Sequence, residues 1–243
     1  MISLIGFGAF AVTSLVIGTR LALRAYHTRQ APEAAMAVAF LGAGAIGNTL
    51  SVLASLGVGG DAAHAPLLAV ARVASVAGSA ALFWFTWAVF RRTSRIAAMA
   101  FGAGLAIQLY TWLGHAWVFG IGADLTSLAW WWPLIAGRSA AYLWAGTEAV
   151  VYWRKMQRRR ELGLADAVTT QRFLLWGFGA SAAFGIFVIT MARTAVTGDL
   201  SPNQLTRDAA SLLGLAAAIF IWTAFFPPAI YTRWVESRAS SAS

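Results

Sequence analysis

Three arginines and one glutamate lie inside long apolar stretches of this sequence, namely Arg72, Arg138, Arg193 and Glu148. A charged side chain inside a bilayer is costly, so we expect it to bind a ligand, pair with another charge or reach the membrane surface. A guanidinium presents a planar set of donors that matches carboxylate and phosphate oxygens. The three arginines lie toward one end of their stretches, which indicates an anion as the ligand.

Polar and aromatic side chains recur beside these arginines at the spacing of one helical face. Ser79 follows Arg72 by two turns, and Tyr142 follows Arg138 by one turn. Lipid cannot satisfy such groups, so we expect these faces to line the interior of a helix bundle. We predict an outward-facing cavity for a small anionic or lipid-like ligand, lined by Arg72, Gln108, Trp112, His115, Trp131, Arg138, Tyr142 and Arg193, with Trp117 as a further wall.

The same arginines also have a structural interpretation. Arg72 and Arg193 lie near enough to the ends of their stretches for their side chains to reach lipid head groups. Asp208 is a candidate to neutralise one of them. Arg138 is the least able to reach the surface, so it is the first choice for a ligand-binding residue.

Glu148 lies toward the other end of the stretch that contains Arg138. The two residues are about 80° apart around the helix axis, so we expect no direct pairing between them. An ion pair with a cluster of basic residues beyond the stretch is the expected outcome, with Arg172 or Arg92 as the partner. A proton-coupling role for Glu148 is the alternative.

Two adjacent prolines, Pro227 and Pro228, lie near the end of the last apolar stretch. They remove two backbone donors and kink a helix, so we predict a hinge at this point. A static kink is the alternative interpretation.

The apolar stretches themselves predict the fold. Of 243 residues, 59% are apolar and 11% are charged, and the mean hydropathy is +0.68. A membrane-spanning helix needs roughly 20 mostly apolar residues. Seven such stretches predict an all-α polytopic membrane helix bundle, with spans at about 2–25, 33–57, 66–90, 96–121, 128–153, 173–197 and 207–232.

Arginine and lysine gather in alternate connections between these stretches, whereas the other connections offer only Arg207. Cytoplasmic loops are enriched in both residue types, so we predict an N-terminus outside and a C-terminus in the cytoplasm. This topology explains the net charge of +9, and no nucleic-acid partner is predicted. The abundance of Ala, Gly and Arg indicates a bacterial protein, hence the plasma (inner) membrane.

We treat residues 1–243 as one seven-helix transmembrane domain with a basic cytoplasmic loop at 154–172 and a short cytoplasmic tail at 234–243. The lipid bilayer is the first predicted partner. The arginines of the loop are suited to an acidic surface, so a cytoplasmic or membrane protein partner is predicted there.

Gly42, Gly44 and Gly47 have the GxGxxG spacing of a dinucleotide-binding loop. No strand pattern precedes them, and they lie in the middle of an apolar stretch. We therefore interpret them as packing glycines that allow close contact between helices.

The leading functional interpretation is a receptor or sensor-like protein, because the arginine and tryptophan residues, the basic loop and the hinge occur together. An organic-anion transporter or channel is one alternative, and a structural or assembly subunit of a larger membrane complex is another. The sequence has no cysteine, no paired carboxylates and no histidine-rich stretch, so we predict no catalytic residues, no metal and no cofactor. A hydrolase that uses His115 with Asp124 stays open.

Overall fold

A computed structural model describes residues 2–240, and this part of the chain forms helices without strands. The helices are α1 (Ile2–Thr28), α2 (Ala31–Val38), the π-helical segment η1 (Ala39–Gly47), α3 (Asn48–Ser55), α4 (Gly60–Phe90), α5 (Arg95–Phe119), α6 (Leu128–Glu161), α7 (Ala167–Thr197), α8 (Gln204–Phe225) and α9 (Ala229–Ser240).

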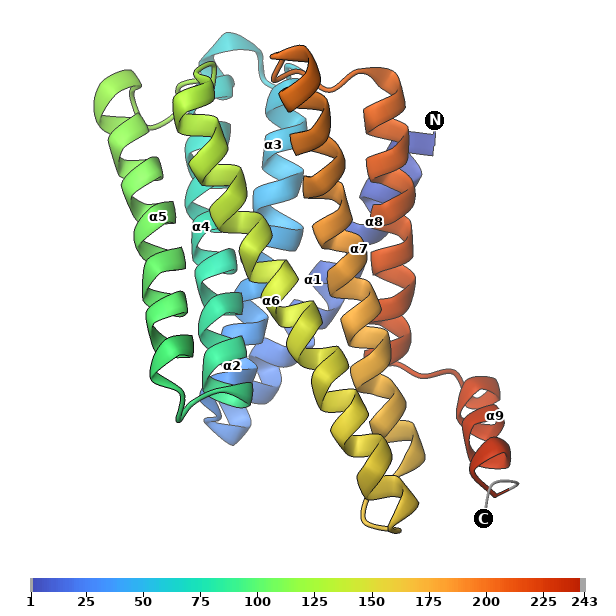
Figure 1. Cartoon of the computed structure of the whole chain (residues 1–243). Helices are drawn as coiled ribbons and strands as arrows, with labels where there is room; N and C mark the ends of the chain where they lie inside the picture. Colours follow the sequence, from blue (N-terminus) through green and yellow to red (C-terminus); the bar gives the residue numbers. More distant parts are fainter. Residues whose placement is uncertain (1, 241–243) are drawn as a thin grey trace.

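The long helices run alternately up and down in one bundle, and the N- and C-terminal ends lie at opposite ends of it (Figure 1). The segments α2, η1 and α3 follow one another as one long helix. Packing closes a ring in the order α8, α1, α2–η1–α3, α4, α6 and α7, and α7 returns to α8. Helix α5 lies outside the ring, against α4 and α6, and α9 stands apart from α8 (Figure 1).

Six helical segments have the length and the apolar composition of membrane spans: Ile5–Thr28, Ala31–Ser55, Gly60–Phe90, Arg95–Phe119, Ala167–Thr197 and Gln204–Phe225. The chain is therefore a multi-pass helical membrane protein, as the sequence predicts. Helix α6 is not among the six. Its sequence holds Arg138, Glu148 and a series of tryptophans, and indole side chains contribute little to hydropathy although they suit the membrane interface.

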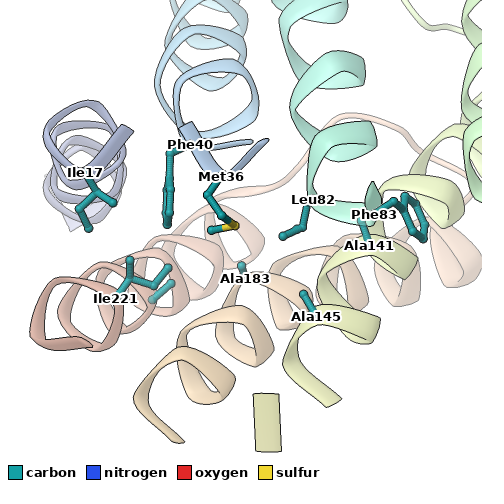
Figure 2. Packing of buried hydrophobic residues seen from close by; sticks show 10 residues of the cluster. Ile17, Met36, Phe40, Leu82, Phe83, Ala141, Ala145, Ala183 and Ile221 are labelled. Atoms are coloured by element: carbon teal, nitrogen blue, oxygen red, sulfur yellow. The ribbon is translucent and has the colours of Figure 1, made fainter. Parts of the chain in front are cut away.

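The interior of the bundle holds many small and polar residues beside a central group of larger apolar side chains, and many other large apolar side chains face outward. Ala141, Ala145 and Ala217 are fully buried, but Leu23 and Ile96 are 60% and 76% exposed. This distribution is expected in lipid, where helices associate through close packing and interhelical hydrogen bonds rather than by burying leucine. Figure 2 shows the centre, where Met36 and Leu82 point toward the same space beside Ala183.

The interpretation of Gly42 as a packing glycine is confirmed. A Cβ atom on Gly42 would lie 2.6 Å from the backbone oxygen of Ala74 and 3.2 Å from the Cα atom of Gly78. Segment η1 therefore touches the backbone of α4 directly. The wider π-helical turn lies at this contact, and such turns are often found at functional sites.

Most of the segment predicted as a basic loop, 154–172, is helical, because only residues 162–166 lie between α6 and α7. The segment RKMQRRRE consists of strong helix formers, so α6 continues through it to Glu161. Gly163, at φ 69°, ends the helix, and the Asp166 carboxylate accepts a hydrogen bond from the Thr169 N–H at 2.7 Å to start α7.

The predicted span 207–232 and the tail at 234–243 also need correction. Helix α8 ends at Phe225, and Pro227 and Pro228 lie in an extended linker before α9. The prolines end the helix rather than kink it, because neither can donate to the preceding turn and Pro228 keeps Pro227 out of the helical region. Residues 229–240 then form α9, whose Val235 is 3% exposed and which packs on α7. A hinge at the linker stays a prediction.

Candidate anion-binding site

Gln108 of α5 lies where α4, α5 and α6 meet, and its side chain is fully buried. Its Oε1 atom accepts a hydrogen bond from the Ser79 hydroxyl of α4. On the other side, a Cβ atom on Gly137 of α6 would lie 2.9 Å from the Gln108 Cγ atom. The absence of a side chain at Gly137 thus lets Gln108 fill the space between three helices.

Seven buried nitrogen atoms of α4, α5 and α6 have no hydrogen-bond partner among the described residues. Two of them, Trp87 Nε1 and Trp153 Nε1, lie toward the ends of α4 and α6 at Phe90 and Glu161, and the other five lie farther from those ends. These five are Arg72 Nη1, Gln108 Nε2, Trp112 Nε1, Arg138 Nε and Arg138 Nη2. All five are donors, and each buried donor without an acceptor costs about 1 to 3 kcal/mol. We call Arg72, Gln108, Trp112 and Arg138 the donor cluster. Such a set is suited to an acceptor-only group, above all an anion.

The two arginines of the donor cluster are close enough to interact electrostatically across α4 and α6. Arg72 also interacts with Asp124 in the connection between α5 and α6. The carboxylate of Asp124 is shared with His64, whose Nε2 atom lies 3.2 Å from both carboxylate oxygens. Arg72 therefore lies near both a second guanidinium and a partly engaged acid, and a bound anion would relieve the repulsion between the two arginines.

His115 contacts the same connection through the backbone of Asp124 rather than through its carboxylate. Its Nε2 atom lies 3.3 Å from the backbone oxygen of Asp124, and its ring packs 5.0 Å from the Phe119 ring. The catalytic pair of His115 with the Asp124 carboxylate is therefore not formed, because that carboxylate contacts His64 instead. His115 instead holds the connection against the end of α5.

The tryptophans divide between the inside and the outside of the bundle. Trp131 is 7% exposed and packs edge-on against Trp132 at 4.9 Å. Trp117 is 91% exposed, so its predicted role as a wall of the site is wrong. The reason is helical phase: Trp117 follows Gln108 by nine residues, which places it about 180° away on α5.

Arg193 has a partner of its own, away from the donor cluster. Its Nη2 atom lies 2.7 Å from Asp199 Oδ2, and its Nη1 donates to the Asp199 backbone oxygen at 3.1 Å. Asp208, the partner proposed from the sequence, instead accepts a hydrogen bond from Gln204 Nε2 at 2.9 Å. Arg193 thus ties the end of α7 to the connection that follows it.

Glu148 forms the expected ion pair, but with another arginine. Arg91 Nε lies 2.8 Å from Glu148 Oε1, and Trp144 Nε1 donates to the same oxygen at 3.2 Å. Arg92 and Arg172 are not the partners. Arg91 immediately follows the last residue of α4, so the packing of α4 on α6 brings it to Glu148.

We call one end of the bundle the basic end; it carries the connections 29–30, 91–94, 162–166 and 226–228. One cavity lies inside the bundle, and a second lies at the basic end. The inner cavity holds about 40 Å³ and is lined by Phe10, Met36, Ala39, Phe40, Gly44, Leu82, Tyr142, Trp176, Ala180, Ala183 and Ile221. The basic-end cavity holds about 390 Å³ and is lined by Arg20, Leu21, Arg24, Pro32, Glu33, Met36, Phe85, Phe90, Arg172, Phe173, Trp176, Ala224 and Phe225.

Of the eight ligand-binding residues predicted from the sequence, Tyr142 alone borders one of these two cavities. Tyr142 also interacts electrostatically with Arg138, so it connects the donor cluster to the inner cavity. Met36 and Trp176 line both cavities and connect the inner one to the basic end.

Sequence reasoning used Arg20 and Arg24 for topology, considered Arg172 also as a partner of Glu148, and missed the cavity that the three arginines line. A signal was present, because Arg20 and Arg24 are four residues apart on one face of α1, and Trp176 follows Arg172 at the same interval. What the sequence could not supply is the packing of α1 near α7, which are far apart in the chain.

Comparisons with protein-family models, with curated proteins and with solved structures found no match for this chain. The fold and the site therefore define only the class of protein. It is a multi-pass helical membrane protein in which buried hydrogen-bond donors at the junction of three helices have no partner among the described residues.

Proposed function

We propose that this chain is a seven-span protein of a bacterial inner membrane that binds a small anionic or lipid-like ligand through the donor cluster and acts as a receptor or sensor-like module. The carrying observation is the set of five buried nitrogen donors, from three helices, without an acceptor among the described residues. Carboxylate and phosphate groups accept several such hydrogen bonds at once, and charge assistance strengthens each of them.

In this proposal α6 is the seventh span. It packs against α4, α5 and α7, all of which have the composition of spans, and it carries two residues of the site's surroundings, Arg138 and Tyr142. An odd number of crossings agrees with termini at opposite ends of the bundle (Figure 1). The basic end then faces the cytoplasm, and the donor cluster lies in the outer half.

Tyr142 and the inner cavity indicate the rest of the ligand. The inner cavity is lined almost entirely by apolar and aromatic residues, and Tyr142 lies one helical turn from Arg138. A ligand with an anionic group and a short apolar body would place the anionic group in the donor cluster and the apolar body toward Tyr142.

The test is anion-dependent stability. Ligands that bind only the folded state raise its unfolding temperature. We expect inorganic phosphate or benzoate to raise the unfolding temperature of the purified protein, and we expect this increase to disappear in Arg138→Gln. Arg207→Gln is the matched control, because Arg207 is an exposed arginine at the same end of the bundle. An equal loss of the increase in both variants would exclude the donor cluster as the site.

Transport of an organic anion is the second candidate, and one observation favours it. Tyr142 borders the inner cavity, and Met36 and Trp176 line both the inner and the basic-end cavity, so a series of residues connects the donor cluster to the basic end. Flux in liposomes separates the two functions. A receptor binds benzoate without flux, whereas a transporter shows uptake that Arg138→Gln abolishes.

A further inference from the structure

The basic-end cavity combines cationic and aromatic walls at one end of the bundle. Arg20 and Arg24 come from α1, Glu33 from α2 and Arg172 from α7. Arg24, Glu33 and Arg172 lie within two turns of the ends of their helices, and Arg20 lies one turn deeper than Arg24 on α1. If the six apolar helices span the bilayer, this is the region where lipid head groups meet the hydrocarbon. The cavity holds about 390 Å³, far more than the inner cavity.

The charges of this cavity do not balance. Arg24 Nε lies 2.6 Å from Glu33 Oε1, so these two residues neutralise each other. The Arg20 guanidinium lies over the Phe226 ring at 4.6 Å, a contact that leaves its donors available. Within residues 2–240, Arg172 makes no ion pair or hydrogen bond and interacts electrostatically with Asp166, which is engaged in capping α7. Arg20 and Arg172 thus give the cavity a positive wall.

The remainder of the cavity is aromatic. Phe85 and Phe90 come from α4, Phe173 and Trp176 from α7, and Phe225 from α8. The Phe225 ring packs edge-to-face on Trp176 at 6.0 Å, and the Phe85 ring lies tilted against Trp176 at 6.3 Å. A water-soluble inorganic anion would use the arginines but gain nothing from these rings. An anion with an apolar chain uses both.

We propose that the basic-end cavity binds an anionic lipid, with its head group between Arg20 and Arg172 and its apolar chain against Phe85, Phe173 and Trp176. Basic pockets between membrane helices are suited to anionic head groups, and the cytoplasmic leaflet supplies such lipids. This site goes beyond the proposed function, since it shares no residue with the donor cluster.

The source of the anionic lipid is either a membrane phospholipid or a free fatty acid, and two arms of one experiment distinguish them. In the first arm, the full-length protein is reconstituted in vesicles with equal amounts of phosphatidylglycerol and phosphatidylcholine of identical chains, then extracted gently. In the second arm, oleate is added to the protein in detergent. Native mass spectrometry measures the lipid that stays bound. Retained phosphatidylglycerol identifies the membrane lipid, and oleate alone identifies the fatty acid.

The variants test the two parts of the cavity. Arg20→Gln/Arg172→Gln is expected to lower retention about tenfold or more, because charge-assisted hydrogen bonds are lost. Arg92→Gln/Arg95→Gln removes the same charge from exposed positions at the same end and should retain the lipid. Ala224→Leu narrows the apolar part and should lower retention with all arginines present.

Three results would overturn the proposal: equal retention of phosphatidylglycerol and phosphatidylcholine, an equal loss in the Arg92→Gln/Arg95→Gln control, or no retained lipid in either arm. Arg138→Gln should leave lipid retention unchanged, so failure of this site and failure of the donor cluster are separate outcomes.

Discussion

Arg91 and Glu148 join the end of α4 to the middle of α6 across 57 residues of sequence, with 2.8 Å between Arg91 Nε and Glu148 Oε1. The pair is asymmetric, because the Arg91 side chain is 44% exposed and that of Glu148 is 11% exposed. The arginine side chain is largely accessible, whereas the carboxylate is nearly buried. Loss of one partner therefore has a different consequence from loss of the other.

We expect Arg91→Leu to destabilise the protein more than Glu148→Gln. The first leaves a buried carboxylate with Trp144 as its remaining donor among the described residues, which costs about 2 to 3 kcal/mol. The second keeps an oxygen acceptor for Arg91 and Trp144 and costs about 1 kcal/mol. Thermal unfolding in detergent measures both variants. Equal losses would show that Glu148 has another donor or is reached by water.

Asp166 predicts a dependence of stability on pH. Hydrogen bonding from the Thr169 backbone N–H lowers the pKa of its carboxyl below the ordinary value of 3.8. A carboxyl with a lowered pKa stabilises the fold at pH values above its ordinary pKa, and the stabilisation is lost as the pH falls through the folded pKa. Wild-type stability should therefore decrease below about pH 4.

Two substitutions at Asp166 separate the cap from the charge. Asp166→Ala should cost about 1 kcal/mol at neutral pH because the first turn of α7 loses its cap. Asp166→Asn keeps an oxygen acceptor, so it should be near wild type at pH 7 and lose less stability under acid. Thermal unfolding across pH 7 to 3 checks this. An unchanged acid profile in Asp166→Asn would contradict the assignment.

Gly42 and Gly102 offer a matched comparison for helix packing. A Cβ atom on Gly42 would overlap the backbone of α4, whereas one on Gly102 meets nothing within 4 Å. We expect Gly42→Ala to destabilise by about 1 to 3 kcal/mol, since backbone must move. Gly102→Ala should be neutral or slightly stabilising because alanine favours the helix. The same loss in both variants would show that η1 does not touch α4.

The seventh span is testable because the chain has no cysteine of its own. Thr126 and Leu164 lie at exposed positions on either side of α6, and Thr93 lies at the basic end. A membrane-impermeant maleimide added to intact cells should label Thr126→Cys, whereas Leu164→Cys and Thr93→Cys should react only after permeabilisation. Labelling of Thr126→Cys and Leu164→Cys from the same side would show that α6 does not cross.

Several features of the site could be predicted from sequence alone and others could not. Arg138 and Gln108 were identified because polar groups inside apolar stretches must face protein. Trp117 was misplaced because it was grouped by residue type, although its helical phase differs from that of Gln108 by about 180°. Arg193 was grouped with Arg138 by depth, but Asp199 is only six residues away in the chain and pairs with it first.

The sequence by itself determined the all-helical membrane class, since apolar stretches of spanning length have no other stable form in lipid. It also determined that Gly42 allows helices to touch and that Gln108 faces inward. Tertiary structure alone decided that Glu148 pairs with Arg91 and that Arg20 and Arg172 share one cavity. Periodicity specifies which face of a helix turns inward, but the partner of that face depends on the order in which helices pack.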